Sequence, residues 1–180
     1  MKIAFDTIHF LQSHGLIMAT AESCTAGLIA STLAEVEGSG TCLDVGIVVY
    51  SPSGKAGFLG VEPATIEQFG LTSEEVAREM AEGLLAHEAC CADLTVANTG
   101  IAGPSPPGSQ LPAGTQCFAW SYNVNGTRAT FSETKVMPGE RNDVRLAAAE
   151  YALSKIQYYH KLIGPSVATR KGMLLAGDTR

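Results

Sequence analysis

Ala21-Glu22-Ser23-Cys24-Thr25-Ala26-Gly27 is the stretch of sequence that decides the fold. It follows the apolar run 16–19 and precedes Leu28, Ile29 and Leu33, which have the spacing of one helix face. A buried strand that turns directly into a helix is typical of an α/β fold. The turn places two hydroxyls and a thiol at a helix N-terminus, where free N–H groups and the helix dipole favour a phosphate or a developing oxyanion.

Apolar periodicity and turn residues predict the other elements around this stretch. Helices are expected at 3–14, 25–36, 63–69 and 141–159, from Lys55 to Gly60, and from a capping box at Thr72–Glu75 to about residue 88. Strands are expected at 16–21, 42–50 and 93–98, followed by a hairpin of 115–123 and 127–136 that turns at Asn125-Gly126. Strands that alternate with helices and close with a hairpin predict a three-layer α/β/α sandwich with a mixed sheet.

Length and charge limit the class of protein. The 180 residues fit one domain, and we expect residues 1–165 to be packed and residues 166–180 to form a mobile tail. A net charge of −6, with no cluster of more than two basic residues, argues against a nucleic-acid surface. No basic region precedes a long apolar run, so we expect no signal peptide and no membrane contact.

The cysteines and histidines predict no metal site. The chain has five cysteines, an odd number without a C-x-x-C pair, and this pattern favours reduced thiols in a cytoplasmic protein. The four histidines are scattered and lack the spacing of metal ligands.

Four residues of the opening stretch each have two possible roles. Ser23 is either the N-cap of the following helix, which is the commonest role of serine there, or a nucleophile. Cys24 is the rival nucleophile, although a small buried apolar role is the commoner one. Thr25 bonds either a substrate oxygen or its own backbone. Glu22 either caps the helix or accepts from a ribose hydroxyl.

Lys55 closes a second segment, Tyr50-Ser51-Pro52-Ser53-Gly54-Lys55. Lysine is usually solvated at the surface, but a desolvated amine near helix dipoles would have a lowered pKa and could act as a base. A Ser–Lys pair is one way to activate a hydroxyl, and both residues follow a predicted strand, where open α/β sheets place their ligand crevice. Tyr50 is either an edge aromatic or a hydroxyl aimed at the same crevice.

Two more segments follow later in the chain. Thr99-Gly100-Ile101-Ala102-Gly103-Pro104 follows a third strand end, and is either a tight turn or a backbone wall that approaches a ligand with free N–H donors. Arg141 and Arg145 share one face of the last helix. Such a pair is usually a solvated stripe, but it could also hold a phosphate by forked contacts.

Taken together, these segments resemble the C-terminal domain of the CinA family, the competence/damage-inducible proteins. The resemblance covers residues 5–160 and lies in 21–27, 50–55, 99–104 and the Gly-x-Arg-x-x-Val-Arg pattern at 139–145. It implies the same α/β/α sandwich. Because stand-alone members are nicotinamide-nucleotide amidohydrolases, it also implies hydrolysis of nicotinamide mononucleotide to nicotinate mononucleotide and ammonia. We expect no cofactor, and a homo-oligomer, with a dimer favoured.

The resemblance also assigns roles to residues. Ser23 would be the nucleophile, Lys55 its base, and Tyr50 an aid to proton transfer or orientation. The expected substrate-binding residues are Cys24, Thr25, Ala26, Gly27, Thr99, Gly100, Ala102, Gly103, Arg141 and Arg145.

The chain departs from the family pattern at three positions near these residues. Ala26, Pro52 and Leu111 stand where the pattern has Gly, Asn and Lys. An alternative to the amidohydrolase is therefore a binding module that holds a nucleotide or phosphate ligand without turnover. Ammonia release by the purified protein separates the two hypotheses.

Overall fold

The structure is a computed structural model that describes residues 2–124 and 127–163. The Asn125-Gly126 turn and the tail 166–180 lie outside the described residues. The elements in chain order are α1 (Lys2–His14), β1 (Met18–Glu22), α2 (Leu28–Ala34), the 3₁₀ turn η1 (Ser39–Thr41), β2 (Leu43–Val48), α3 (Pro52–Leu59), α4 (Pro63–Phe69), α5 (Glu74–Ala86), β3 (Leu94–Gly100), β4 (Thr115–Val124), β5 (Thr127–Val136), α6 (Arg141–Ser154) and α7 (Ile156–Leu162).

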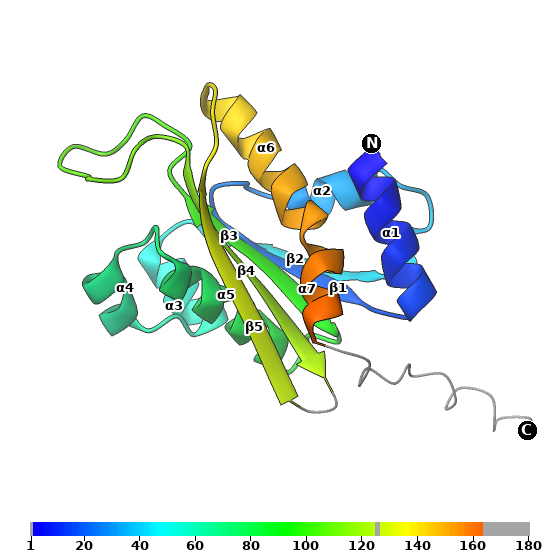
Figure 1. Cartoon of the computed structure of the whole chain (residues 1–180). Coiled ribbons are helices and arrows are strands. Elements are labelled where there is room, and N and C mark those ends of the chain that lie inside the picture. The colour runs from blue at the N-terminus through cyan, green and yellow to red at the C-terminus, as the bar shows by residue number, and fades with distance from the viewer. Residues whose placement is uncertain (1, 125–126, 164–180) are drawn as a thin grey trace, which may run out of the picture.

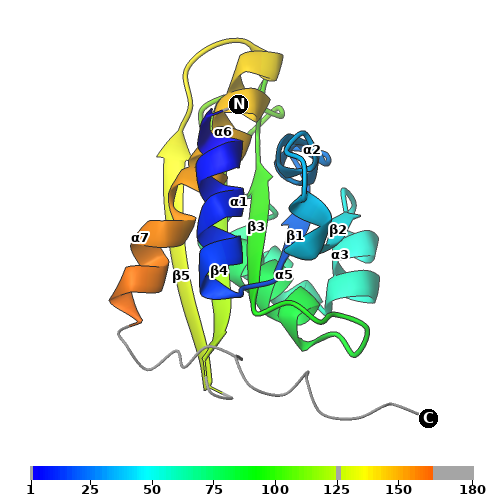
Figure 2. The ribbon, with the colours of Figure 1, turned by 90° about the vertical axis from the view of Figure 1, so that its right-hand side faces the viewer.

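The five strands form one mixed sheet in the order β2-β1-β3-β4-β5. β1 pairs in parallel with β2 and β3, whereas β3–β4 and β4–β5 are antiparallel. Helices α1, α2, α6 and α7 cover one face of the sheet and α3, α4 and α5 cover the other (Figures 1 and 2). This arrangement confirms the three-layer α/β/α sandwich expected from the sequence.

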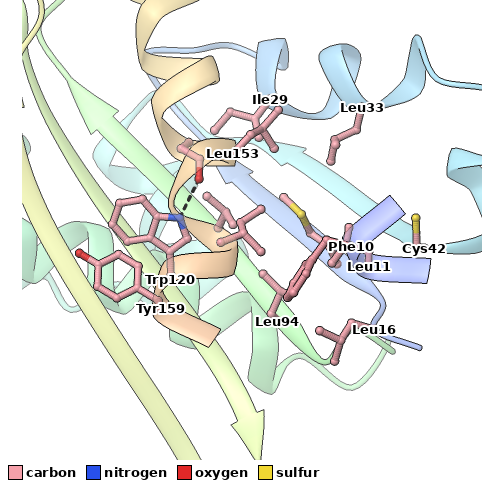
Figure 3. Packing of buried hydrophobic residues seen from close by; sticks show 14 of the residues in the cluster. Phe10, Leu11, Leu16, Ile29, Leu33, Cys42, Leu94, Trp120, Leu153 and Tyr159 are labelled. Carbon is pink, nitrogen blue, oxygen red and sulfur yellow. Dashed lines mark hydrogen bonds between the residues drawn. The ribbon is translucent and has the colours of Figure 1, made fainter. Parts of the chain in front are cut away.

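The alternation of side chains along β4 divides the core between the two faces. Phe118, Trp120 and Tyr122 point to the face covered by α1, α2, α6 and α7, where they pack with apolar residues of those helices (Figure 3). The indole N–H of Trp120 donates to the Ala152 carbonyl at 2.8 Å, which satisfies the buried donor.

The opposite face of the sheet carries small side chains. Ala19, Ala21, Ala97 and Ala119 pack there against α5 and the end of α3. Helices α3 and α5 also approach closely, since a Cβ on Gly83 would lie 1.7 Å from the backbone oxygen of Leu59. Only glycine fits at this crossing, which fixes α3 and the site residues that it carries.

Four expected features of the helices are wrong. The last helix is divided at Lys155 into α6 and α7; Trp120 and Tyr122 donate to the Ala152 and Ile156 carbonyls on the two sides of this division. The helix expected to start at Lys55 starts at Pro52, because Ser51 caps it and proline suits the first helical position.

The other two boundaries differ because of their caps. The cap of α5 is Ser73, which accepts from the Val76 N–H, so the expected capping box at Thr72–Glu75 is not formed. The helix expected at 25–36 starts only at Leu28. Within the described ranges, no helix is both long and apolar enough to cross a membrane.

Candidate active site

The sheet topology creates a crevice at the carboxyl ends of the parallel strands. β1 leads into α2 on one face of the sheet, and its neighbour β2 leads into α3 on the opposite face. Neighbouring strands whose helices leave to opposite faces open a space between them, where α/β proteins bind ligands. A cavity of about 430 Å³ lies at this point.

The cavity brings together nine of the thirteen residues expected at the site. Its lining includes Ser23, Cys24, Tyr50, Lys55, Thr99, Gly100, Ala102, Gly103 and Arg141. Thr25, Ala26, Gly27 and Arg145 are not part of the lining. Among the lining residues none is acidic, although the chain as a whole has a net charge of −6. The charged side chains in the lining are those of Lys55 and Arg141, and both are basic.

Ser23 and Lys55 meet inside this cavity. Lys55 Nζ donates to Ser23 Oγ at 2.8 Å and to the Val49 carbonyl oxygen at 2.9 Å. Ser23 does not cap α2, because Gly27 holds the cap position of that helix. Its hydroxyl bonds only the lysine among the described residues. A nucleophile and a base at hydrogen-bond distance are what covalent catalysis requires.

Lys55 is buried, with 1% of its surface exposed, so it is not a solvated lysine. Burial lowers the pKa of Lys55 from 10.5 to about 8, and the nearby Cys24 sulfur opposes this shift. At neutral pH roughly a tenth of such side chains are uncharged, and this neutral form can accept a proton. The Val49 carbonyl takes one N–H, so that the lone pair of the neutral amine can face Ser23.

The N-terminus of α2 is already occupied by a residue of the chain itself. The fully buried Glu22 carboxylate accepts hydrogen bonds from the N–H groups of Gly27, Ile29 and Ala30, at 2.8, 3.1 and 2.9 Å. Of its two expected roles, Glu22 therefore caps the helix. These three donors are not available to a substrate phosphate or an oxyanion, contrary to the expectation from the sequence.

Ala26 has a left-handed backbone conformation, with φ of +51°. It is the one non-glycine residue with positive φ among those the structure describes. Glycine adopts this conformation freely, whereas a Cβ makes a left-handed residue costly by about 1–2 kcal/mol. Ala26 was expected to bind substrate, but it lies outside the cavity.

The two arginines of α6 have different surroundings. Arg141 lines the cavity and donates to the Gly103 carbonyl at 2.8 Å. Arg145 instead donates to the carbonyl oxygens of Cys24 and Thr25, at 3.1 and 3.2 Å. Its guanidinium thus holds the turn that carries Ser23, whereas Arg141 is the arginine placed to meet a ligand.

Part of the site could not be found from the sequence motifs. The end of α4 and its connection to α5 contribute Phe69, Gly70, Leu71 and Thr72 to one wall. Leu111, already noted as a departure from the family pattern, lines the cavity as well. Asn98 and Gln116 lie fully buried behind the Ser23 turn. In the sequence, the only feature that indicates Asn98 and Gln116 is an amide side chain within a strand that is otherwise mostly apolar.

The comparisons with known proteins point to one family. The family model of the CinA C-terminal domain matches residues 2–159. A CinA-like protein of Chlorobaculum tepidum is 42% identical over 147 residues, which are 81% of this chain and 34% of that protein. One of Mycolicibacterium paratuberculosis is 45% identical over 141 residues, 77% of this chain and 32% of that protein. The chain therefore spans about a third of the length of these curated relatives.

Solved structures show the same fold. The competence or damage-inducible protein of Enterobacter asburiae superposes with a TM-score of 0.80 at 34% identity, over 87% of this chain and 95% of that chain. The competence damage-inducible protein A of Klebsiella pneumoniae gives 0.81 at 30% identity, over 91% and 97%. With the family model, the relatives and these structures in agreement, the chain belongs to the CinA C-terminal domain family.

Proposed function

We propose that this domain hydrolyses the carboxamide of nicotinamide mononucleotide, giving nicotinate mononucleotide and ammonia, with Ser23 as nucleophile and Lys55 as base. The observation that carries the proposal is the 2.8 Å contact between Lys55 Nζ and Ser23 Oγ, made by a buried lysine with a pKa of about 8. A serine hydroxyl needs such a partner to attack an amide at neutral pH.

The first half of the reaction forms an ester on Ser23. Neutral Lys55 takes the Ser23 proton while Oγ bonds to the carboxamide carbon, and the carbonyl oxygen becomes an oxyanion. The Lys55 ammonium then gives its proton to the amide nitrogen, the C–N bond breaks, and ammonia leaves. In the second half, Lys55 takes a proton from water while the resulting hydroxide attacks the ester carbon. When the ester C–O bond breaks, the Lys55 ammonium gives this proton to the Ser23 oxygen, which restores both groups.

Backbone N–H groups at the cavity would donate to the oxyanion. Within residues 2–124 and 127–163, no protein acceptor is paired with the N–H of Cys24, Ala102 or Gly103. Cys24 directly follows the nucleophile, and all three residues line the cavity. Donors fixed in the backbone need little reorganisation, so they can stabilise the charge that develops in the transition state.

The rest of the cavity is suited to a nucleotide with a flat ring. Arg141 lies on the wall and offers a charged fork to a phosphate. Phe69, Leu71 and Ile101 supply apolar surface for a heteroaromatic ring. The departure at Leu111 removes a charge from this region but leaves the Ser23–Lys55 pair intact.

Ammonia release tests the proposal most directly. Purified protein, with no metal added, is incubated with nicotinamide mononucleotide, and ammonia and nicotinate mononucleotide are measured together. Ser23→Ala and Lys55→Arg should both lose activity, because the first lacks the nucleophile and the second cannot act as a base near neutral pH. Saturable binding of the nucleotide without ammonia release would favour the binding-module alternative instead.

A further inference from the structure

Two buried amides connect the sheet to the turn that carries the nucleophile. Asn98 lies on β3 and Gln116 on β4, and both side chains are fully buried. Asn98 Nδ2 donates to Gln116 Oε1 at 3.1 Å, and Gln116 Nε2 donates to Cys24 Sγ at 3.4 Å. Asn98 Oδ1 accepts from the Thr25 N–H at 3.2 Å. The pair therefore contacts the turn at two consecutive residues.

The hydrogen bonds of this pair can run in only one direction. The Thr25 N–H is a fixed donor, so it requires the oxygen of the Asn98 amide and directs the NH₂ group of Asn98 to Gln116. Gln116 must then present its oxygen to Asn98 and its own NH₂ group to the Cys24 sulfur. Gly100 makes room for this arrangement, since a Cβ at that position would lie 2.5 Å from the Gln116 side chain.

The amides act on the peptide that follows Ser23. The backbone carbonyl of Asn98 accepts from the Ser23 N–H at 2.9 Å, so that Asn98 holds the chain on both sides of Cys24. Arg145 holds the carbonyl side of the same turn. The Cys24 N–H is thereby fixed in direction beside the nucleophile, and no acceptor among the described residues is paired with it.

We propose that Asn98 and Gln116 are positioning residues, which align Ser23 and the Cys24 N–H for attack on the substrate and for binding of the oxyanion. The inference rests on the proposed function for its choice of Ser23 as nucleophile. Neither amide lines the cavity, so neither is expected to contact the substrate. Their loss should therefore lower kcat and leave KM nearly unchanged, because misplacing a reacting group by about 1 Å can cost about 100-fold in rate.

The test uses two variants that change the amides by few atoms. Gln116→Met keeps the volume but removes both hydrogen bonds. Asn98→Asp keeps the acceptor for the Thr25 N–H but removes the donor, so that Gln116 must turn over and present its oxygen to Cys24. The control for Gln116→Met is Gln157→Met on α7. The control for Asn98→Asp is Asn123→Asp, because Asn123 is an exposed residue of β4.

Each protein is labelled with a fluorophosphonate, which reacts with Ser23 to form a tetrahedral adduct. The intact mass of the protein identifies the adduct, and the Ser23→Ala variant shows that it forms on Ser23. Ammonia release from nicotinamide mononucleotide gives kcat and KM separately, and thermal unfolding confirms that each variant is folded. We expect labelling and kcat to fall about tenfold or more in both variants, with KM within about threefold of the parent and with controls like the parent. In Gln116→Met, which introduces no charge, the midpoint of the pH–labelling curve should stay where it is, because the base is intact.

Parent-like labelling and kcat in both variants would overturn the inference, and so would a variant that rises in KM alone. If both variants are unfolded at the assay temperature, the amides serve the fold and the positioning role is wrong. If the parent is labelled on Ser23 but releases no ammonia, the proposed substrate fails, and the labelling rates still decide the role of the amides.

Discussion

Lys55 Nζ lies 2.8 Å from Ser23 Oγ, although the two residues are 32 positions apart in the chain. Ser23 follows β1 and Lys55 lies in the first turns of α3, so the parallel pairing of β1 with β2 brings them together. The contact thus depends on the register of two strands rather than on any local motif.

The pH dependence of activity should follow the protonation of Lys55. The reactive form is the neutral amine, and burial sets the pKa of Lys55 at about 8. We therefore expect kcat/KM to rise about tenfold per pH unit from pH 6 to near 8 and to level off above it. Ammonia release between pH 6 and 9.5, repeated for Ser23 labelling, measures this. A flat profile across that range would remove Lys55 from the role of base.

Lys55 should lower the free energy of unfolding of the protein at neutral pH. Its pKa is lowered in the folded state, so the folded protein binds fewer protons between pH 8 and 10.5 and its stability rises with pH in that window. Below pH 8 the full cost of burying the charge is present. Lys55→Met should raise the free energy of unfolding at pH 7 by about 1–3 kcal/mol. This range follows from roughly 1.4 kcal/mol for each pKa unit by which burial lowers the lysine pKa, minus the hydrogen bonds that the substitution removes.

Denaturant unfolding at pH 7 and pH 10 measures this effect. The advantage of Lys55→Met should shrink at pH 10, where the parent lysine is neutral in the folded state. Lys161→Met, on the exposed surface of α7, is the control and should change stability by less than about 0.5 kcal/mol at either pH. A Lys55→Met protein less stable than the parent at pH 7 would mean that the hydrogen bonds of Lys55 outweigh the desolvation of its charge.

Glu22→Gln should be strongly destabilising although it replaces a single atom. Both carboxylate oxygens accept from backbone N–H groups of α2, and one of them must become an NH₂ group that faces another donor. We expect a loss of about 2–4 kcal/mol in the free energy of unfolding. Glu35→Gln, exposed at the other end of the same helix, should be near neutral. Equal effects of the two changes would contradict the buried capping role.

The architecture could be predicted from the sequence because the patterns that indicate strands and helices are local. Alternating strands and helices predicted the sandwich, and three motifs at strand ends predicted the crevice, since parallel strands end at a common edge. The choice between the roles of Glu22 was not local. Its side chain could reach either a ligand or the helix start, and only the left-handed turn at residues 26–27 brings three N–H groups to it.

Other parts of the site arise from packing between distant elements. Phe69 ends the short helix α4 and Leu71 follows it. Neither belongs to a motif, yet α4 and α5 place both on the cavity wall. The division of the last helix at Lys155 likewise coincides with donors that come from β4, which no pattern within 141–159 contains. Arg141 and Arg145 share a helix face, but only the structure distinguishes a cavity residue from one that holds a turn.

Ala26→Gly should stabilise the protein. The left-handed φ of +51° is unfavourable for alanine and free for glycine, which offsets the greater entropy of glycine in the unfolded chain. We expect a gain of about 0.5–1 kcal/mol in chemical denaturation. Ala34→Gly, at the exposed end of α2 and in helical conformation, is the control and should lose about 0.5–1 kcal/mol. A loss for both substitutions would argue that residue 26 is not left-handed in solution.

Arg141 and Arg145 should separate in their effects on two substrates, nicotinamide mononucleotide and its phosphate-free riboside. Arg141 lines the cavity, so Arg141→Ala should raise KM for the mononucleotide by about tenfold and leave the riboside nearly unchanged. Arg145 holds the carbonyls of Cys24 and Thr25, so Arg145→Ala should lower kcat for both substrates alike and lower the melting temperature. Steady-state kinetics of the four combinations measure both effects. A phosphate-specific loss in Arg145→Ala, with none in Arg141→Ala, would reverse the two assignments and would mean that Arg145 leaves the turn to bind the nucleotide.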